Sequence, residues 1–411
     1  MKIGKITALV LVLTLLAFVV LVGCNSTAPE EDITNNCVPT EQAKAAQPVS
    51  GVNLAAVKGI AAVADENGFS IIDEKTGKET QIDNEPARSV AFDGNTAYYV
   101  RTGIADESVK IRYDDDTMVD PDSKAVWLRG EIYRYNSESG KSERLFTTNE
   151  EHASLVYFDS ENLYYTDYSD ENTGYYVGSS KVIAPVLFKY NLASGKRTYV
   201  SQYTCKAEVY DGYIFYNAYD GNSSRHPNFV YPGPVHIYDT KSGKDVNLDD
   251  QSEFLFAENG KFYYVRFITE KDIVTGGEIR KCNADGNQLE TVKELSGEIW
   301  SRYGEYLVLI ENDEDYVAYN TRTDKKFNVD RTWLWLEGNG CFAAIENDGN
   351  GEKLYRIDDS GEKDLYADLN GIEVGGRDSL TIVERTYSGL YVLEEDDAES
   401  VGNIKFIPTG A

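Results

Sequence analysis

The sequence predicts an all-β protein, a β-propeller built from four-stranded antiparallel blades. The first observation is a phrase that recurs along the chain, with EIYRYNSESGK at 131–141 and VLFKYNLASGK at 186–196 among its copies. The second is a half-unit before each copy, in which two β runs flank a tight turn. Four strands that repeat every ~40–50 residues are typical of a propeller. No stretch between 51 and 411 has a convincing helical period, which excludes helical-repeat solenoids.

The first half of each unit is expected to form strands A and B. Asp-Gly or a similar pair turns A into B, because such hairpin turns need a positive φ, which glycine adopts without steric cost. Tyr, Phe, Val and Ile alternate in the runs, as they do in strands packed between neighbouring sheets. In chain order these halves occupy 53–65, 90–100, 156–168, 208–219, 254–267, 299–310 and 334–345.

The second half of each unit is expected to form strands C and D, joined by Ser-Gly-Lys or a similar triplet. These halves occupy 68–78, 131–141, 186–196, 235–244, 278–292, 316–329 and 353–366. Their turns are marked by Gly77, Gly140, Gly195, Gly243, Gly286, Asp324 and Gly361. An eighth set begins at 372–384 but has no clear Gly-Lys turn. We expect eight blades, with seven as the alternative, in which terminal strands would complete one shared closing blade.

The segment between strands B and C varies most from unit to unit. It spans 101–130 in unit two, about 169–185 in unit three and 220–234 in unit four, and it shortens afterwards. Strand parity puts the A–B and C–D turns on one face of the propeller and the B–C and D–A connections on the other. Function is expected on the B–C face, because long loops on a rigid scaffold usually carry it.

A binding patch is predicted on this loop-bearing face. Units two to four are consecutive, so their loops must be neighbours in a ring of blades. Aromatic side chains with a few polar anchors suit a protein, peptide or glycan ligand. The alternative is that these rings only pack the loops onto the propeller rim. The predicted patch comprises Tyr113, Asp116, Trp127, Tyr168, Tyr176, His226 and Tyr231. Lys141 and Lys196, in tight turns of the other face, are expected to have no part in binding.

Metal binding and catalysis have little support in the sequence. YDDDTMVDPDS at 113–123 could offer Asp oxygens to Ca²⁺, but its spacing matches no EF-hand, and an acidic solvated loop is the simpler interpretation. No nucleophile elbow, zinc-binding His-Glu pair or Gly-rich phosphate loop is present. We expect no catalytic residue, metal or cofactor. The alternative is a carbohydrate-active lyase or hydrolase, which a cluster of Tyr, Arg and carboxylate at the channel mouth would favour.

The N-terminus has the pattern of a secretory signal, 1–23. Lys2 and Lys5 precede an almost unbroken apolar run that ends at Val22. Leu21-Val22-Gly23-Cys24 resembles the bacterial lipobox. The resemblance implies cleavage before Cys24, a lipid on its thiol, and an extracytoplasmic protein anchored in the cell membrane by acyl chains such as palmitate. An uncleaved membrane-spanning helix is the alternative.

The mature chain is expected to be a tethered, acidic domain. Residues 24–50 are polar and proline-bearing, as flexible tethers are, and the propeller follows at 51–411. The formal net charge of -29 becomes -31 when the two Lys of the signal are removed. Such a surface argues against nucleic acid and against electrostatic docking on anionic lipid. We expect a monomer whose hold on the membrane is its lipid.

The repeats resemble the secreted propeller superfamily that includes the Tol-system propeller and many uncharacterised Gram-positive lipoproteins. The Gly-His and Trp-Asp signatures of WD-repeat proteins are missing. The resemblance implies a fold and no particular activity.

Four cysteines follow Cys24 in the sequence. Cys37 falls in the tether, whereas Cys205, Cys282 and Cys341 fall in different repeats. No C-x-x-C spacing is present. We therefore expect no disulfide.

Overall fold

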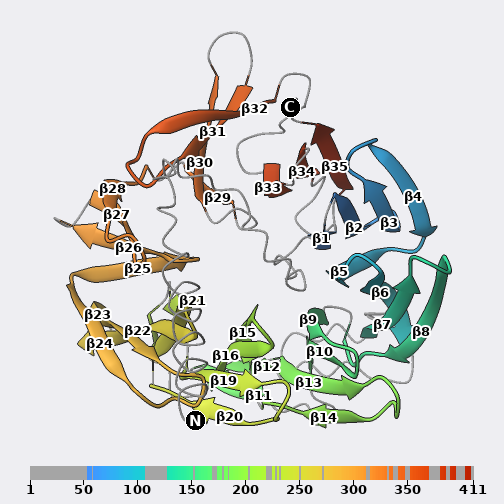
Figure 1. Cartoon of the computed structure of the whole chain (residues 1–411), viewed down its shortest axis with the longest axis horizontal. Coiled ribbons are helices and arrows are strands. Elements are labelled where there is room, and N and C mark those ends of the chain that lie inside the picture. Colours follow the sequence, from blue (N-terminus) through green and yellow to red (C-terminus); the bar gives the residue numbers. More distant parts are fainter. Residues whose placement is uncertain are drawn as a thin grey trace, which may run out of the picture. The chain divides into compact units, whose positions relative to one another are not determined.

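The computed structural model confirms a β-propeller of four-stranded antiparallel blades (Figure 1). The residues that the structure describes are 53–57, 59–106, 127–150, 153–168, 174–177, 180–183, 185–201, 204–218, 225–226, 229–230, 233–249, 251–270, 273–311, 315–330, 333–336, 341–347, 352–369, 380–385, 389–394 and 403–408. No helix in these ranges is long and apolar enough to cross a membrane.

Blades 1 to 4 come from the first part of the propeller. Blade 1 comprises β1 (Asn53–Val57), β2 (Ile60–Asp65), β3 (Gly68–Asp73) and β4 (Lys78–Asp83). Blade 2 comprises β5 (Ala87–Phe92), β6 (Thr96–Asp106), β7 (Trp127–Asn136) and β8 (Lys141–Thr147). Blade 3 comprises β9 (Ser154–Phe158), β10 (Asn162–Asp167), β13 (Val186–Asn191) and β14 (Arg197–Tyr199). Blade 4 comprises β15 (Thr204–Tyr210), β16 (Tyr213–Ala218), β19 (Val235–Asp239) and β20 (Asp245–Asn247).

Blades 5 to 7 and three smaller sheets complete the described strands. Blade 5 comprises β21 (Ser252–Glu258), β22 (Lys261–Glu270), β23 (Ile273–Cys282) and β24 (Glu290–Ser296). Blade 6 comprises β25 (Glu298–Tyr303), β26 (Tyr306–Glu311), β27 (Asp315–Asn320) and β28 (Lys326–Asn328). Blade 7 comprises β29 (Leu334–Leu336), β30 (Cys341–Asn347), β31 (Glu352–Ile357) and β32 (Lys363–Asp368). The smaller sheets are β11 (Gly174–Val177) with β12 (Ser180–Ile183), β17 (Arg225–His226) with β18 (Phe229–Val230), and the three-stranded β33 (Leu380–Arg385), β34 (Gly389–Glu394) and β35 (Asn403–Pro408).

Within the described ranges the four-stranded blades number seven, the alternative to the eight that we expected. The described strands of the eighth set form the three-stranded sheet β33–β35. This set has no clear counterpart of the Gly-Lys turns that join the third and fourth strands of blades 1 to 4. Among the described strands, β1 pairs with β2 and β35 with β34, so these sheets do not mix the two ends of the chain.

The seven residues that mark the C–D turns all adopt a positive φ. Their φ values lie between 62° and 83°, and they belong to Gly77, Gly140, Gly195, Gly243, Gly286, Asp324 and Gly361. The turn geometry therefore explains why the sequence repeats Ser-Gly-Lys. In Figure 1 the first strand of each blade lies toward the centre of the ring and the fourth lies at its rim.

Aromatic rings pack neighbouring blades against each other. The ring of Tyr99 in blade 2 stacks on Phe69 of blade 1 with centroids 4.2 Å apart. Phe215 of blade 4 and Phe254 of blade 5 stack with centroids 3.8 Å apart. Tyrosines dominate the largest fully buried side chains, as expected for strands packed on both faces.

Two of the cysteines have described side chains, and both are buried thiols outside any disulfide. They are Cys282 in the third strand of blade 5 and Cys341 in the second strand of blade 7, where the repeat predicts them. Burial raises the pKa of the Cys282 thiol to about 11. Cys37 and the side chain of Cys205 lie outside the described residues.

Candidate functional site

The predicted insertions occupy the B–C connections of three consecutive blades. The segment between β6 and β7 carries the first, the hairpin β11–β12 lies between β10 and β13, and the hairpin β17–β18 lies between β16 and β19. The second and third strands of a blade are joined on one face of an antiparallel sheet. The three insertions therefore leave the propeller on one face, which we call the loop face.

The structure describes the predicted patch only in part. Tyr113, Asp116 and Tyr231 lie outside the described residues. Trp127 begins β7 opposite Asp106, Tyr176 pairs with Lys181 in β11–β12, and His226 pairs with Phe229 in β17–β18; only their backbones are described. Tyr168 follows β10 directly and is half-buried. All four thus lie in or next to the B–C connections, and whether the seven form one patch remains a prediction.

A buried hydroxyl group holds the base of each of the three insertions. The N–H of Gly130 in β7 donates to Thr148 Oγ1 over 2.8 Å, and the N–H of Val235 in β19 donates to Ser252 Oγ over 3.1 Å. In blade 3 the N–H of Leu187 in β13 donates to Ser201 Oγ over 3.4 Å. Each donor lies near the start of a third strand, where the chain returns from an insertion. We call Thr148, Ser201 and Ser252 the hydroxyl clamps.

The clamps also tie down the connections to the following blades. Thr148 Oγ1 donates to the carbonyl of Glu150 over 2.7 Å, and Ser252 Oγ donates to the carbonyl of Asp249 over 2.5 Å. Gly130 permits the first of them, because a Cβ at that position would lie 2.8 Å from Thr148 Oγ1. The sequence did not single out these residues, since Ser and Thr also occur in many exposed turns.

Asp167, the last residue of β10, fixes the start of the blade 3 insertion. Its carboxylate accepts backbone N–H groups of Asn149 over 2.8 Å, Glu150 over 3.2 Å and Tyr168 over 2.9 Å. The side-chain amide of Asn149 donates to the carbonyl of Tyr168 over 2.6 Å. Tyr168 is therefore held by both its N–H and its carbonyl before the insertion begins.

Burial dominates the electrostatics of Asp167, whose side chain is 0% exposed. It raises the pKa of Asp167 to about 6, although the three N–H donors and Arg197, 3.6 Å away, act in the opposite direction. The carboxyl group thus takes up a proton more readily in the folded protein than in the unfolded chain, where it has its ordinary pKa of 3.8.

This shift predicts a pH dependence of stability. A raised folded pKa gives a contribution that is fully present below about pH 4 and is lost as the pH rises through about 6. Asp167→Asn removes the titration. The free energy of unfolding of the wild type minus that of the variant should therefore fall between pH 4 and pH 7, by roughly 3 kcal/mol at most. Urea unfolding at both pH values measures it, and a difference that rises with pH would contradict the assignment.

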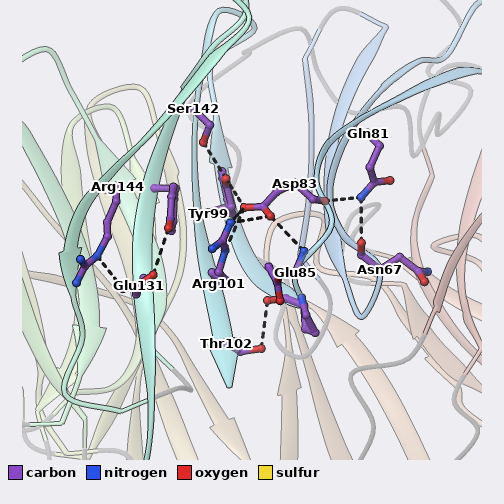
Figure 2. A network of polar contacts seen from close by, with 12 residues as sticks. Asn67, Gln81, Asp83, Glu85, Tyr99, Arg101, Thr102, Glu131, Ser142 and Arg144 are labelled. Atoms are coloured by element: carbon purple, nitrogen blue, oxygen red, sulfur yellow. Dashed lines mark hydrogen bonds and ion pairs between the residues drawn. The ribbon is translucent and has the colours of Figure 1, made fainter. Parts of the chain in front are cut away.

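An ion-pair network joins blades 1 and 2 (Figure 2). Asp83, at the end of β4, accepts the hydroxyl of Tyr99 over 2.8 Å and two contacts from Arg101 Nη2 over 2.8 and 2.7 Å. Burial alone would raise the pKa of Asp83, but hydrogen bonds from Arg101 and Tyr99 and the charge of Arg101 lower it below the usual value. Arg101 lies in β6, the strand that leads into the insertion.

The same arrangement recurs between blades 4 and 5. Asp249 accepts the hydroxyl of Tyr264 over 2.6 Å and Arg280 Nη1 over 2.7 Å. A cleft of ≈ 440 Å³ opens beside it on the loop face. Its lining residues are Asp249, Gln251, Arg266, Phe267, Ile268 and Thr269. Ile268 is 39% exposed, so the cleft offers an apolar contact next to charged groups.

A second charged cluster lies on the innermost strands. Arg302 of blade 6 binds Glu208 of blade 4 through Nη1 to Oε1 over 2.6 Å and Nη2 to Oε2 over 3.0 Å. Its Nε lies 3.8 Å from Glu253 Oε2 of blade 5. Blade 5 separates blades 4 and 6, so this contact forms on the side of the central channel. We call Arg302, Glu208 and Glu253 the channel cluster.

The contacts of the channel cluster are those of a structural ion pair that holds neighbouring blades together. The Arg302 side chain is only 3% exposed, and both carboxylate oxygens of Glu208 accept hydrogen bonds from it. The Arg302 Nε donates to the carbonyl of Gly304 over 2.9 Å. In the described part of the chain, no group of three or more His, Cys, Asp or Glu side chains could hold a metal ion.

Comparison with known proteins gives distant similarities. No family model and no curated protein matches the chain. Among solved structures, a prolyl endopeptidase is 11% identical over 87% of this chain with a TM-score of 0.44. The propeller domain of the trilobed protease from Pyrococcus furiosus is 14% identical over 78% of this chain and 99% of its own, with a TM-score of 0.41. Oligogalacturonate lyase from Vibrio parahaemolyticus is 11% identical over 79% of this chain and 94% of its own, with a TM-score of 0.41.

The chain spans about half the length of the peptidases that it resembles, 55% of the prolyl endopeptidase and 51% of an acylaminoacyl peptidase from Pyrococcus horikoshii. Such similarities carry no inference about activity. The seven four-stranded antiparallel blades described above are what identify the chain as a β-propeller.

Proposed function

We propose that this protein is a lipid-anchored, extracytoplasmic binding or scaffold module that holds a protein, peptide or glycan on its loop face. The observation that supports the proposal best is the set of hydroxyl clamps at the bases of the three insertions. An insertion with a fixed base presents its side chains with less loss of conformational entropy on binding. The cleft beside Asp249 adds a recessed polar and apolar surface on the same face.

The binding prediction concerns aromatic residues of the insertions. Tyr176→Ala or Tyr231→Ala is expected to weaken ligand capture by about 2 kcal/mol or more, because large rings at the centre of an interface commonly dominate the affinity. Capture is measured by pull-down from the native envelope, followed by titration of the recovered ligand. Circular dichroism of each variant checks the fold.

The matched control is Lys196→Ala, in the C–D turn of blade 3 on the opposite face. Lys196 is exposed, and its replacement should leave capture unchanged. Loss of capture in Lys196→Ala, with full capture in both tyrosine variants, would show that the binding surface is not on the loop face.

The anchoring prediction concerns Cys24. Cys24→Ala is expected to abolish lipid attachment, because no other residue in the lipobox-like motif carries a thiol. Metabolic labelling with a fatty-acid analogue, followed by fractionation of the envelope, measures the attachment. Equal labelling of wild type and variant would show that the motif does not act as a lipobox in this protein.

The second candidate function is a carbohydrate-active lyase or hydrolase with a site at the channel. The channel cluster favours it, since Arg302 and two carboxylates converge there. Against it, the charges of Arg302 and Glu208 are paired with each other, which leaves Glu208 poorly placed for proton transfer. Turnover of a pectin or glycan substrate that is lost in Glu253→Gln, a variant that spares the Arg302–Glu208 pair, would favour the enzyme.

A further inference from the structure

A cleft lies on the face opposite the loops, between blades 2 and 3. It has a volume of ≈ 820 Å³, and its rim carries Asp93 and Asp159 from the A–B turns of these two blades. Tyr98, Tyr157 and Phe158 supply aromatic surface, and Leu192 comes from the C–D turn of blade 3. We call this cleft the turn groove. We expected no binding on this face from the sequence, since its turns are short.

An arginine occupies the corresponding position between blades 5 and 6. Arg322, in the C–D turn of blade 6, donates from Nε to Glu305 Oε2 over 2.6 Å and from Nη1 to Glu258 Oε1 over 3.4 Å. Its guanidinium carbon lies 4.3 Å from the centroid of the Phe256 ring. Glu305 belongs to the A–B turn of blade 6 and Glu258 to that of blade 5. One guanidinium group therefore bridges the two blades.

The residue at the same turn position in blade 3 is Ala193. In blade 6 the N–H of Asp324 donates to the carbonyl of Asn320, and in blade 3 the N–H of Gly195 donates to the carbonyl of Asn191. Both turns therefore close over four residues, and both closing residues have a positive φ, 62° and 68°. Arg322 and Ala193 stand two residues after the respective asparagine. The turn groove thus lacks the side chain that bridges blades 5 and 6.

The carboxylates that would hold such a side chain are nevertheless present. Asp93 corresponds to Glu258, since each precedes the two central residues of an A–B turn, Gly94-Asn95 or Asn259-Gly260. Glu161 corresponds to Glu305, because its carbonyl accepts the N–H of Leu192 over 2.8 Å as that of Glu305 accepts the N–H of Thr321 over 2.9 Å.

No cation among the described residues pairs with Asp93 in the turn groove or with Glu161, which follows the lining residue Ser160. Asp93 uses Oδ1 to accept the N–H groups of Asn95 and Thr96, over 2.8 and 2.7 Å, and leaves Oδ2 free for a ligand. The carboxylate of Glu161 is exposed. Between blades 5 and 6, both equivalent carboxylates are bound to Arg322.

The basic residues of the turn groove do not cancel its negative charge. Arg134 is paired with Glu143, so this guanidinium is already neutralised. The remaining cation among the lining residues is Lys141, which is exposed. Asp93 and Asp159 in the groove outnumber it, and Glu161 directly follows the lining residue Ser160. A positively charged group therefore fits the groove better than an anion does.

We propose that the turn groove binds an arginine side chain of a peptide segment in a partner protein. The guanidinium group would lie between Asp93 and Glu161 as Arg322 lies between Glu258 and Glu305. Planar guanidinium groups suit this role because they donate to two carboxylates and also stack on aromatic rings. The turn groove lies on the face opposite the loop face, so either binding proposal can be refuted without refuting the other.

A blocked peptide, acetyl-Gly-Arg-Gly-amide, is the probe. Calorimetric titration at low ionic strength is expected to show one-to-one binding of this peptide. The same peptide with citrulline in place of arginine keeps the shape but loses the charge, and it should bind at least tenfold more weakly. Asp93→Asn should weaken binding of the arginine peptide about tenfold, since it removes a charge-assisted hydrogen bond. The asparagine oxygen can still accept the N–H groups of the turn, so the fold is preserved.

Two further variants test the comparison between the blades. Ala193→Arg should fill the groove from within, abolish peptide binding and raise Tm, whereas Ala193→Ser should bind as the wild type does. Arg322→Ala should open the groove between blades 5 and 6 and raise the stoichiometry from one to two. Equal binding of the arginine and citrulline peptides, no detectable binding of either, or unchanged binding in Ala193→Arg would each overturn the proposal.

Discussion

Arg302→Ala is expected to lower the free energy of unfolding by about 3–5 kcal/mol. The side chain of Arg302 is 3% exposed and joins the innermost strands of blades 4, 5 and 6. Removing it takes away the ion pair with Glu208, whose side chain is only 23% exposed. An uncompensated charge in a poorly hydrated site costs far more than the loss of an exposed ion pair. Urea unfolding followed by tryptophan fluorescence and circular dichroism measures the difference.

Arg322→Ala supplies a matched control for this prediction. Arg322 also pairs with two glutamates from neighbouring blades, but its side chain is 39% exposed. Exposed pairs contribute about 1 kcal/mol or less, because water solvates both partners after the pair is broken. Equal losses of stability in the two variants would show that burial at the channel does not set the strength of the cluster. A double-mutant cycle with Glu208→Ala isolates the coupling of Arg302 to Glu208.

The repeat made most of the blade architecture predictable. A C–D turn needs a positive φ at one position. Every unit therefore has a residue that adopts this conformation, such as Gly140 or Asp324, at the same place in the repeat. Alternation of apolar residues then assigns the strands on either side. The number of blades was harder, because the last set has strands without that turn and forms only a three-stranded sheet.

The channel cluster could not be predicted from alternation. The pairing of β25 with β26 shifts register between Ile299 and Ser301, just before Arg302. A shift of this kind changes which side chains face the channel, and nothing in the local sequence marks it. The acid partners also lie 49 and 94 residues away in the chain, for Glu253 and Glu208 respectively. Only the ring closure of the blades brings the three together.

The turn groove shows a second limit of reading single repeats. The sequence shows Ala193 where another unit has Arg322, but an exposed alanine in a turn carries no signal by itself. The substitution gains meaning only by comparison with the turn of blade 6, where Arg322 binds one carboxylate of its own blade and one of the preceding blade. The hydroxyl clamps are similar, since Thr148 is distinguished from other threonines by its burial and by the N–H of Gly130.

Asp83→Ala is expected to lower the free energy of unfolding by about 3 kcal/mol at pH 7. The side chain of Asp83 is 7% exposed, and its loss leaves Arg101, 24% exposed, without a counter-charge between blades 1 and 2. The pKa of Asp83 is lowered in the folded protein, so its contribution is present above the unfolded pKa of 3.8 and is lost as the pH falls through the folded value. The gap in stability between wild type and variant should therefore narrow under acid conditions.

Tyr99→Phe separates the ion pair from the rest of this network. The phenylalanine keeps the ring that stacks on Phe69 and removes only the hydroxyl, which donates to Asp83. The hydroxyl also forms a hydrogen bond with Ser142 Oγ over 2.8 Å. The expected cost is therefore about 2 kcal/mol, since each hydrogen bond usually contributes about 1 kcal/mol net. Urea unfolding of both variants at pH 7 and near pH 3 makes the comparison. If Asp83→Ala costs no more than Tyr99→Phe, or its effect grows as the pH falls, the charge of Asp83 does not hold blades 1 and 2 together.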